Sequence, residues 1–337
     1  MTRATGEEAT DGLVSLSALA GSRQHGILLT KQAVALGWPV RRFNRRLRSE
    51  GWTQIHRGAW AEPGLEVDHT VRLRAIQLAR PELVASHRTA AWLHTIELPW
   101  ETDQARNVEA GLKLDFITPT TTTTYPGASR STGRTRRAPA LAAGDTGTLA
   151  GIRVTTVNRA LADLLRAGPR DSALVAVDSA ISIRPLQVNM TVKRPALTHT
   201  AAVAAALESG PRRGLRTARA WLALADRKSG SPPETLARLR IHDAGLHPES
   251  QVGVRPPGGR RRSVDFLFRA EGLAVEIEGY TYHGTRAAHQ RDVARFNELA
   301  GCAPIRRILR FTAVDVYRRP ASMIAEIHKA LTSLAGG

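Results

Sequence analysis

Three acidic side chains fall on two consecutive strand-like segments in the C-terminal part of the chain. These segments are Val264-Asp265-Phe266-Leu267-Phe268 and Leu273-Ala274-Val275-Glu276-Ile277-Glu278-Gly279. Side chains alternate between two faces along a strand, so Asp265, Glu276 and Glu278 are predicted to lie opposite the apolar side chains. The apolar face is expected to hold Val264, Phe266, Phe268, Val275 and Ile277. The short turn between the strands ends in Gly272, which predicts a hairpin with Asp265 near Glu276.

Carboxylates that converge on one face of a sheet repel one another unless a cation neutralises them. Ligand sets made only of oxygen suit Mg²⁺ or Mn²⁺, which activate water and stabilise charge on a transferring phosphoryl group. The alternative is a polar, solvent-facing side of an ordinary antiparallel hairpin. The spacing of the acids alone leaves both interpretations open.

The composition favours a polyanionic partner. The chain has 337 residues, enough for two or three domains, and its 48 Lys and Arg against 30 Asp and Glu give a formal net charge of +18. Nucleic acid is therefore the first candidate partner, ahead of a membrane surface, although a GC-rich genome also enriches arginine. The single cysteine, Cys302, excludes internal disulfides and a multi-cysteine metal site. The chain shows no signal-peptide pattern and no apolar run of membrane-spanning length, so a cytoplasmic protein with no membrane association is expected.

The segment 27–63 has the pattern of a winged helix. Thr30 is predicted to cap a first helix that ends near Gly37, and a second helix is predicted over Arg41–Glu50, with apolar Phe43 and Leu47 one turn apart. The segment 52–63 then resembles a two-stranded wing. Such an order places the second helix in the DNA major groove. The candidate DNA contacts are Arg41, Arg42, Arg45, Arg46 and Arg57. The alternative is a basic, solvated helix in an ordinary domain.

The rest of the chain is predicted to hold a mostly helical middle region and a third domain. Between Asp115 and Gly151 the composition indicates loops around one or two strands. The segment 228–233 reads as a linker. After it the expected order is helix, hairpin, helix, strand and helix, which predicts a mixed sheet covered by helices. The predicted fold class is multidomain α+β.

The third domain resembles the Vsr-like branch of the PD-(D/E)XK nucleases. The residues that carry the resemblance are Glu234 in Ser231-Pro232-Pro233-Glu234-Thr235, Asp265, Glu276-Ile277-Glu278-Gly279, His283 and Asp292-Val293-Ala294-Arg295. The resemblance implies a restriction-endonuclease-like α/β domain, with Asp265 and Glu276 as the metal ligands. Glu278 stands where the superfamily has lysine, so His283 becomes the candidate general base. The simpler alternatives are a loop histidine bound by backbone for His283 and a charge that complements the helix dipole for Glu234.

The region from Ile27 to about Asp226 resembles the N-terminal part of AbiEi-type antitoxins. The matching residues are Arg57-Gly58-Ala59-Trp60, Ala85-Ser86-His87-Arg88-Thr89-Ala90-Ala91-Trp92-Leu93-His94 and Val154-Thr155-Thr156-Val157-Asn158-Arg159-Ala160-Leu161-Ala162-Asp163-Leu164. The expected domains are a winged helix at 1–66, an AbiEi-like middle domain at 67–230 and a Vsr-like nuclease domain at 231–337. The resemblance implies DNA binding and repression of the protein's own operon.

Two functions of different classes follow. The first is a Mg²⁺- or Mn²⁺-dependent DNA endonuclease in phage defence or DNA repair, with Glu278 assisting and Glu234 orienting the site. The second is a non-enzymatic antitoxin or transcriptional repressor that retains an inactive nuclease fold. A homodimer and a cognate toxin are further candidate partners, and an RNA-directed nuclease is a third, weaker hypothesis.

Overall fold

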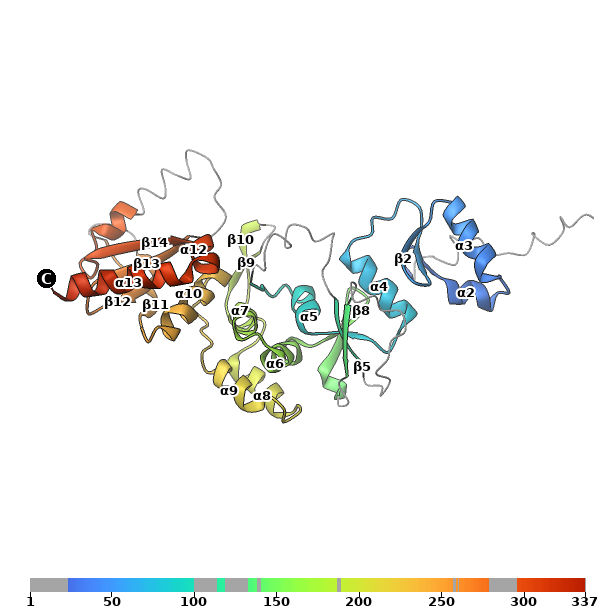
Figure 1. The fold of residues 1–337 in the computed structure, drawn as a ribbon, viewed down its shortest axis with the longest axis horizontal. Coiled ribbons are helices and arrows are strands. Elements are labelled where there is room, and N and C mark those ends of the chain that lie inside the picture. The colour runs from blue at the N-terminus through green and yellow to red at the C-terminus, as the bar shows by residue number, and fades with distance from the viewer. Residues whose placement is uncertain are drawn as a thin grey trace, which may run out of the picture. The chain divides into compact units, whose positions relative to one another are not determined.

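The computed structural model describes residues 24–99, 114–118, 133–137, 141–186, 189–256, 259, 261–278 and 296–336. They form a mixed α/β protein with several sheets (Figure 1). The chain divides into two compact units, one formed by 1–90 with 101–156 and the other by 91–100 with 157–337. In the described ranges, no helix combines the length and the apolar character needed to span a bilayer.

The first unit opens with a small antiparallel sheet that two helices interrupt. The elements are β1 (Ile27–Leu29), α2 (Thr30–Ala35), α3 (Val40–Ser49), β2 (Thr53–His56) and β3 (Ala59–Ala61), with strand order β1-β3-β2. Phe43 and Leu47 are fully buried against Trp60, as their spacing predicts. The prediction that Thr30 caps α2 is wrong, because the helix begins at Thr30, whose Oγ1 accepts a hydrogen bond from the indole of Trp60 at 3.3 Å.

A five-stranded mixed sheet follows in the same unit, with strand order β6-β5-β4-β8-β7. Its strands are β4 (Val84–Ala85), β5 (Leu114–Thr118), β6 (Gly133–Arg137), β7 (Thr146–Leu149) and β8 (Ile152–Thr155). The helices of this part of the chain are α4 (His69–Ala79) and α5 (His87–Leu93). The segment from Asp115 to Gly151 thus contributes to three strands, where one or two were expected. The pairings of β5 with β6 and of β4 with β8 are parallel and join distant segments, which local alternation does not indicate.

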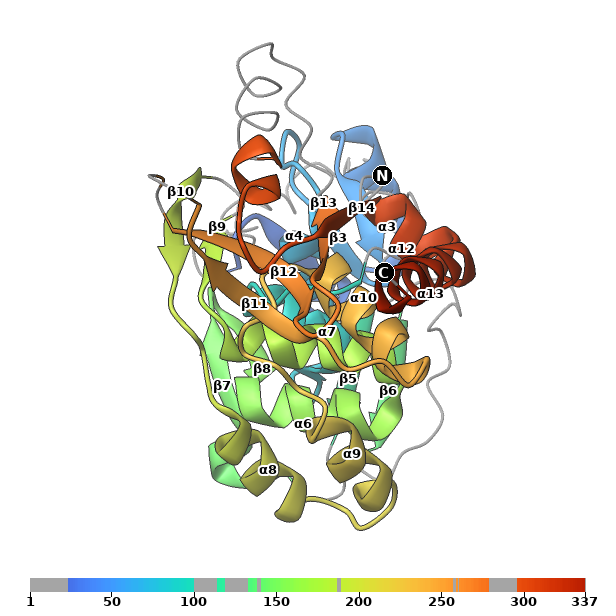
Figure 2. The same cartoon turned by 90° about the vertical axis from the view of Figure 1, so that its left-hand side faces the viewer.

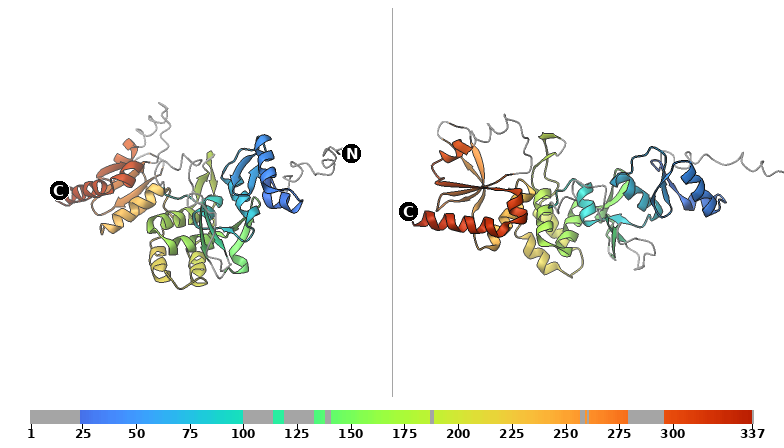
Figure 3. Two further views of the ribbon diagram at one scale, coloured as in Figure 1. Left: turned by 45° about the vertical axis from the view of Figure 1, so that its right-hand side comes forward. Right: turned by 45° about the horizontal axis from the view of Figure 1, so that its top comes forward.

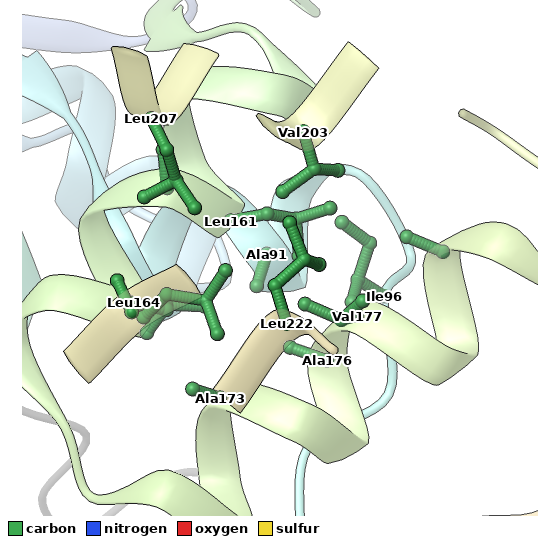
Figure 4. Packing of buried hydrophobic residues seen from close by; sticks show 14 of the residues in the cluster. Ala91, Ile96, Leu161, Leu164, Ala173, Ala176, Val177, Val203, Leu207 and Leu222 are labelled. Carbon is green, nitrogen blue, oxygen red and sulfur yellow. The ribbon is translucent and has the colours of Figure 1, made fainter. Parts of the chain in front are cut away.

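The second unit begins with a helical layer. It contains α6 (Val157–Ala167), α7 (Arg170–Ile181), a hairpin of β9 (Arg184–Leu186) and β10 (Asn189–Arg194), α8 (Thr200–Glu208) and α9 (Leu215–Leu222). Leu161, Val177, Val203 and Leu222 meet in one apolar core to which these four helices contribute (Figure 4). Burial of these side chains from water stabilises the layer.

The C-terminal part of this unit is a four-stranded mixed sheet with helices. Its elements are α10 (Pro232–Asp243), β11 (Glu249–Val254), β12 (Arg262–Phe268), β13 (Leu273–Glu278), β14 (Arg307–Thr312), α12 (Ala313–Arg318) and α13 (Pro320–Ala335). The strand order is β11-β12-β13-β14, with only the last pair parallel (Figure 2). Helices α10 and α13 both pack on β13, and Figure 3 shows α13 lying along the sheet. The predicted mixed sheet covered by helices is confirmed.

Apolar side chains cover both faces of this sheet. Phe266 and Val275 face the core shared with α10 and α13, as predicted. Val264 does not join them, because it pairs with Val252 and packs in a second core that contains Leu267. Leu299, Cys302 and Ile305 cover that second core. The face that carries the acids is therefore not a simple solvent-facing side of a hairpin.

Candidate functional site

Asp265 and Glu276 lie side by side on neighbouring antiparallel strands, as the hairpin pattern predicts. Phe266 pairs with Val275 in the strand register, and the next step along β12 brings the backbone N–H of Asp265 to Oε1 of Glu276 at 3.3 Å. The second oxygen of Asp265, Oδ2, accepts from the backbone N–H of Ile277 at 2.7 Å. Glu276 is only 8% exposed. Two carboxylates, one of them buried, are thus fixed at one point of the sheet.

Glu234 reaches the same point from the first turn of α10. The N-cap Ser231 and the residues Pro232 and Pro233 begin this helix in the way that favours an acid in its first turn. The carboxylate of Glu234 accepts hydrogen bonds from the hydroxyl of Ser231 at 2.8 Å and from the backbone N–H of Gly230 at 2.7 Å. These contacts hold the side chain at the N-terminus of α10, where its charge also complements the helix dipole.

Gln251 joins Glu234 to Asp265, and sequence reasoning missed it. Its amide Nε2 donates to Oε2 of Glu234 at 2.9 Å and to Oδ1 of Asp265 at 2.7 Å. It lies on β11, a strand that was not predicted. The available signal was the alternation of Val252 and Val254 just before the prolines at 256 and 257.

Burial and the charge of Asp265 together raise the pKa of Glu234 to about 7. A carboxyl group whose pKa is higher in the folded chain binds its proton more readily when folded. The free energy of unfolding is therefore expected to fall as the pH rises from about 4.5 to about 7, by roughly 3 kcal/mol for a shift of this size. Thermal unfolding of the wild type and of Glu234→Gln in EDTA, at pH 4.5 to 8, measures this difference. Glu234→Gln should lack the fall in stability that the titration of Glu234 causes. Equal pH profiles for the two proteins would contradict the raised pKa of Glu234.

Glu278 forms an ion pair across the parallel strands β13 and β14. Its Oε1 lies 2.5 Å from Nη2 of Arg310, whose guanidinium also lies over the ring of Phe296 at 5.5 Å. The resemblance expects a lysine at position 278. The structure instead brings the guanidinium of Arg310 to the side chain of Glu278 from the neighbouring strand, a pairing that the sequence did not indicate.

The donors present suit a hard divalent cation. Asp265 and Glu276 offer oxygen atoms, and Mg²⁺ in proteins often takes one or two carboxylates and completes its shell with water. In the described ranges, no group of three or more His, Cys, Asp or Glu side chains could hold a metal ion. His283 and the segment 292–295, which the sequence also assigned to this site, lie outside the described residues.

The predicted DNA contacts lie on α3 and on the turn between β2 and β3. Arg41, Arg42 and Arg45 are exposed, and none forms an ion pair within the part of the chain that the structure describes. Arg46 differs, because its Nε lies 2.6 Å from Oε1 of Glu50 and its guanidinium lies over the ring of Trp38 at 5.2 Å. The turn residue Arg57 is exposed and lines a cavity of about 240 Å³ together with Lys31, His56 and Arg80.

Comparison with known proteins assigns no function. No protein-family model matches the chain. Two uncharacterised proteins from Mycobacterium tuberculosis, MT2308 of strain CDC 1551 and Rv2248 of strain H37Rv, are each 34% identical over 128 residues, which is 38% of this chain and 46% of the relative. The chain therefore spans less than half the length of the curated relatives it matches. The crystal structure of the Rv2827c protein from Mycobacterium tuberculosis is similar with a TM-score of 0.41 and 17% identity, covering 67% of this chain and 78% of that chain.

Proposed function

We propose that the chain is a DNA-binding protein whose C-terminal part hydrolyses DNA phosphodiesters with the help of Mg²⁺ or Mn²⁺. The observation that carries the proposal is the pair of carboxylates on β12 and β13, Asp265 and Glu276, with Glu234 joined to it through Gln251. Such a cation, when bound, supplies an activated water and stabilises charge on the phosphoryl group. Asp265 and Glu276 would hold it.

The other residues of the site have roles that follow from their contacts. The half-buried Glu234 is held at the N-terminus of its own helix and orients its neighbours rather than meeting substrate. Arg310 is paired with Glu278 and would bring positive charge to a bound phosphate, where the nuclease resemblance expects a lysine. His283 remains the proposed general base.

The basic N-terminal segment is proposed to deliver this site to DNA as a winged helix. Its support is the strand order β1-β3-β2 with α2 and α3 between β1 and β2, and the exposed arginines on α3. Helix α3 would enter the major groove and Arg57 would contact the backbone from the wing.

Replacing Arg45 with alanine is expected to weaken DNA binding and to reduce the salt dependence of binding by about one phosphate contact, a change of roughly 0.9 in the slope of log K against log salt. Arg46→Ala is the comparison on the same helix, and a smaller effect is expected because Arg46 is already paired with Glu50 at 2.6 Å. Fluorescence anisotropy with a labelled duplex, at several salt concentrations, measures both slopes. Affinity and a salt slope that Arg45→Ala leaves unchanged would contradict the assignment of α3 as the DNA-contacting helix.

The catalytic half of the proposal is tested by incubating the purified protein with supercoiled plasmid and Mg²⁺. Conversion to nicked or linear DNA that EDTA prevents supports it. DNA binding without cleavage would favour a regulator of the antitoxin type that has kept the fold without the reaction.

A further inference from the structure

The carboxamide of Gln251 donates both of its N–H groups to carboxylates. One goes to Glu234 at 2.9 Å and the other to Asp265 at 2.7 Å, while its Oε1 accepts from the hydroxyl of Ser263 at 2.9 Å. A primary amide has two N–H donors, so this side chain has none left for another partner. The Ser263 contact fixes which end of the amide faces the acids.

Gln251 has an unusual backbone conformation within β11. Its φ is +49°, in the left-handed region that non-glycine residues adopt at a cost of order 1 kcal/mol or more. It lies opposite Asp265, between the register pairs Ser250 with Phe266 and Val252 with Val264. The hydrogen bonds of the side chain to two acids offset that cost.

Glu234, which accepts one of these hydrogen bonds, is itself held by two donors at the start of α10. Gly230 and Ser231 donate to its two oxygens, and a side chain at Gly230 would place its Cβ 2.9 Å from Oε2 of Glu234. The contacts thus form a chain from the N-terminus of α10, through Glu234 and Gln251, to Oδ1 of Asp265. The carboxylate of Asp265 meets both Gln251 and the backbone of the hairpin.

We propose that Gln251 is a positioning residue through which Glu234 orients Asp265 toward the divalent cation. The inference rests on the proposed metal-dependent function. It assigns Glu234 to the support of a metal ligand and not to the metal itself. Hydrogen-bond partners behind a metal ligand fix its direction, and their loss typically weakens metal binding by about 10- to 100-fold.

The test is a double-mutant cycle on Mn²⁺ affinity, measured by electron paramagnetic resonance on the full chain with no DNA present. Gln251→Met keeps the length of the side chain and removes its hydrogen bonds, and it should weaken Mn²⁺ binding by about 10- to 100-fold and alter the spectrum of the bound ion. Glu234→Ala should weaken binding in the wild type and have no further effect in Gln251→Met. The matched control is Glu249→Gln, an exposed acid on the same strand that pairs with Arg269, which should leave Mn²⁺ binding unchanged.

The outcomes distinguish a failure of the proposed metal-dependent function from a failure of the positioning role of Gln251. Wild type that binds no Mn²⁺ overturns the proposed metal-dependent function and this inference with it. Wild type that binds Mn²⁺, together with folded Gln251→Met that binds it equally well, overturns the inference alone. A full additional loss from Glu234→Ala in the Gln251→Met background overturns it too, since Glu234 would then act independently of Gln251. If circular dichroism shows that Gln251→Met does not fold, Ser263→Ala decides: weaker binding supports the inference and unchanged binding overturns it.

Discussion

Asp265→Ala is expected to lower the rate of Mg²⁺-dependent plasmid nicking by at least about 10³-fold, because several kcal/mol of transition-state stabilisation depend on the cation and each 1.4 kcal/mol is tenfold in rate. The effect should be large because Asp265 is the meeting point of the site. It contacts Gln251 on one side and the backbone of Ile277 on the other, with Glu276 beside it.

Two further variants make the Asp265 result interpretable. Asp265→Asn keeps the shape and removes the charge, so it should lose activity while circular dichroism shows that the fold is retained. Its melting temperature should fall, because the new amide Nδ2 must face an N–H donor of Gln251 or Ile277. Glu271→Gln changes an acid in the turn of the same hairpin, away from the site, and should retain wild-type activity. Nicking by Asp265→Asn at the wild-type rate would show that the acids on β12 and β13 do not carry the reaction.

Arg238→Leu is expected to lower the free energy of unfolding by about 3–5 kcal/mol, the usual effect of leaving a buried charge without its partner. Asp178 on α7 is fully buried and accepts from Arg238 at 2.8 Å, from Thr235 at 3.0 Å and from the backbone of Asp226 at 2.8 Å. Arg238 and Thr235 lie on α10, the helix that carries Glu234. The hydrogen bonds of Asp178 to Arg238 and Thr235 therefore fix α10 to α7 in the helical layer as well as stabilising the unit.

Urea denaturation followed by circular dichroism at pH 7 measures that loss. Arg240→Leu is the matched control two positions along the same helix, because its pair with Asp171 at 2.6 Å is partly exposed, and its effect should be within about 1 kcal/mol. Burial raises the pKa of Asp178, so the neutral Asp178→Asn should recover much of the stability lost by Arg238→Leu in a double variant. An Arg238→Leu variant as stable as the Arg240→Leu variant would show that the buried pair of Arg238 with Asp178 does not stabilise the unit.

The juxtaposition of Asp265 and Glu276 could be predicted from the sequence because its determinants are local. A short turn ending in Gly272 sets the register of the hairpin, and the register alone brings Asp265 beside Glu276. The first turn of α10 likewise follows from Ser231 and the prolines after it. Alternation along the strands assigned Phe266 and Val275 to the correct core.

Other parts of the site depend on pairings between distant segments. Gln251 acts only because β11 pairs with β12, and Arg310 reaches Glu278 only because β14 runs parallel to β13. Val264 was assigned to the wrong core, because both faces of the sheet are apolar and alternation then does not separate them. The five-stranded sheet was missed for a similar reason, since β4 has only two residues and its partners come from far along the chain.

The most direct measurement of the central claim is DNA cleavage by the wild type beside the double variant Asp265→Ala/Glu276→Ala, in Mg²⁺ and in EDTA. Supercoiled, mismatched and single-stranded DNA are the substrates. The wild type should nick at least one of them in Mg²⁺ and none in EDTA, and the double variant should leave all of them intact. A wild type that cuts none of them, or a double variant that still cuts, would contradict the assignment of these carboxylates to a metal-dependent nuclease.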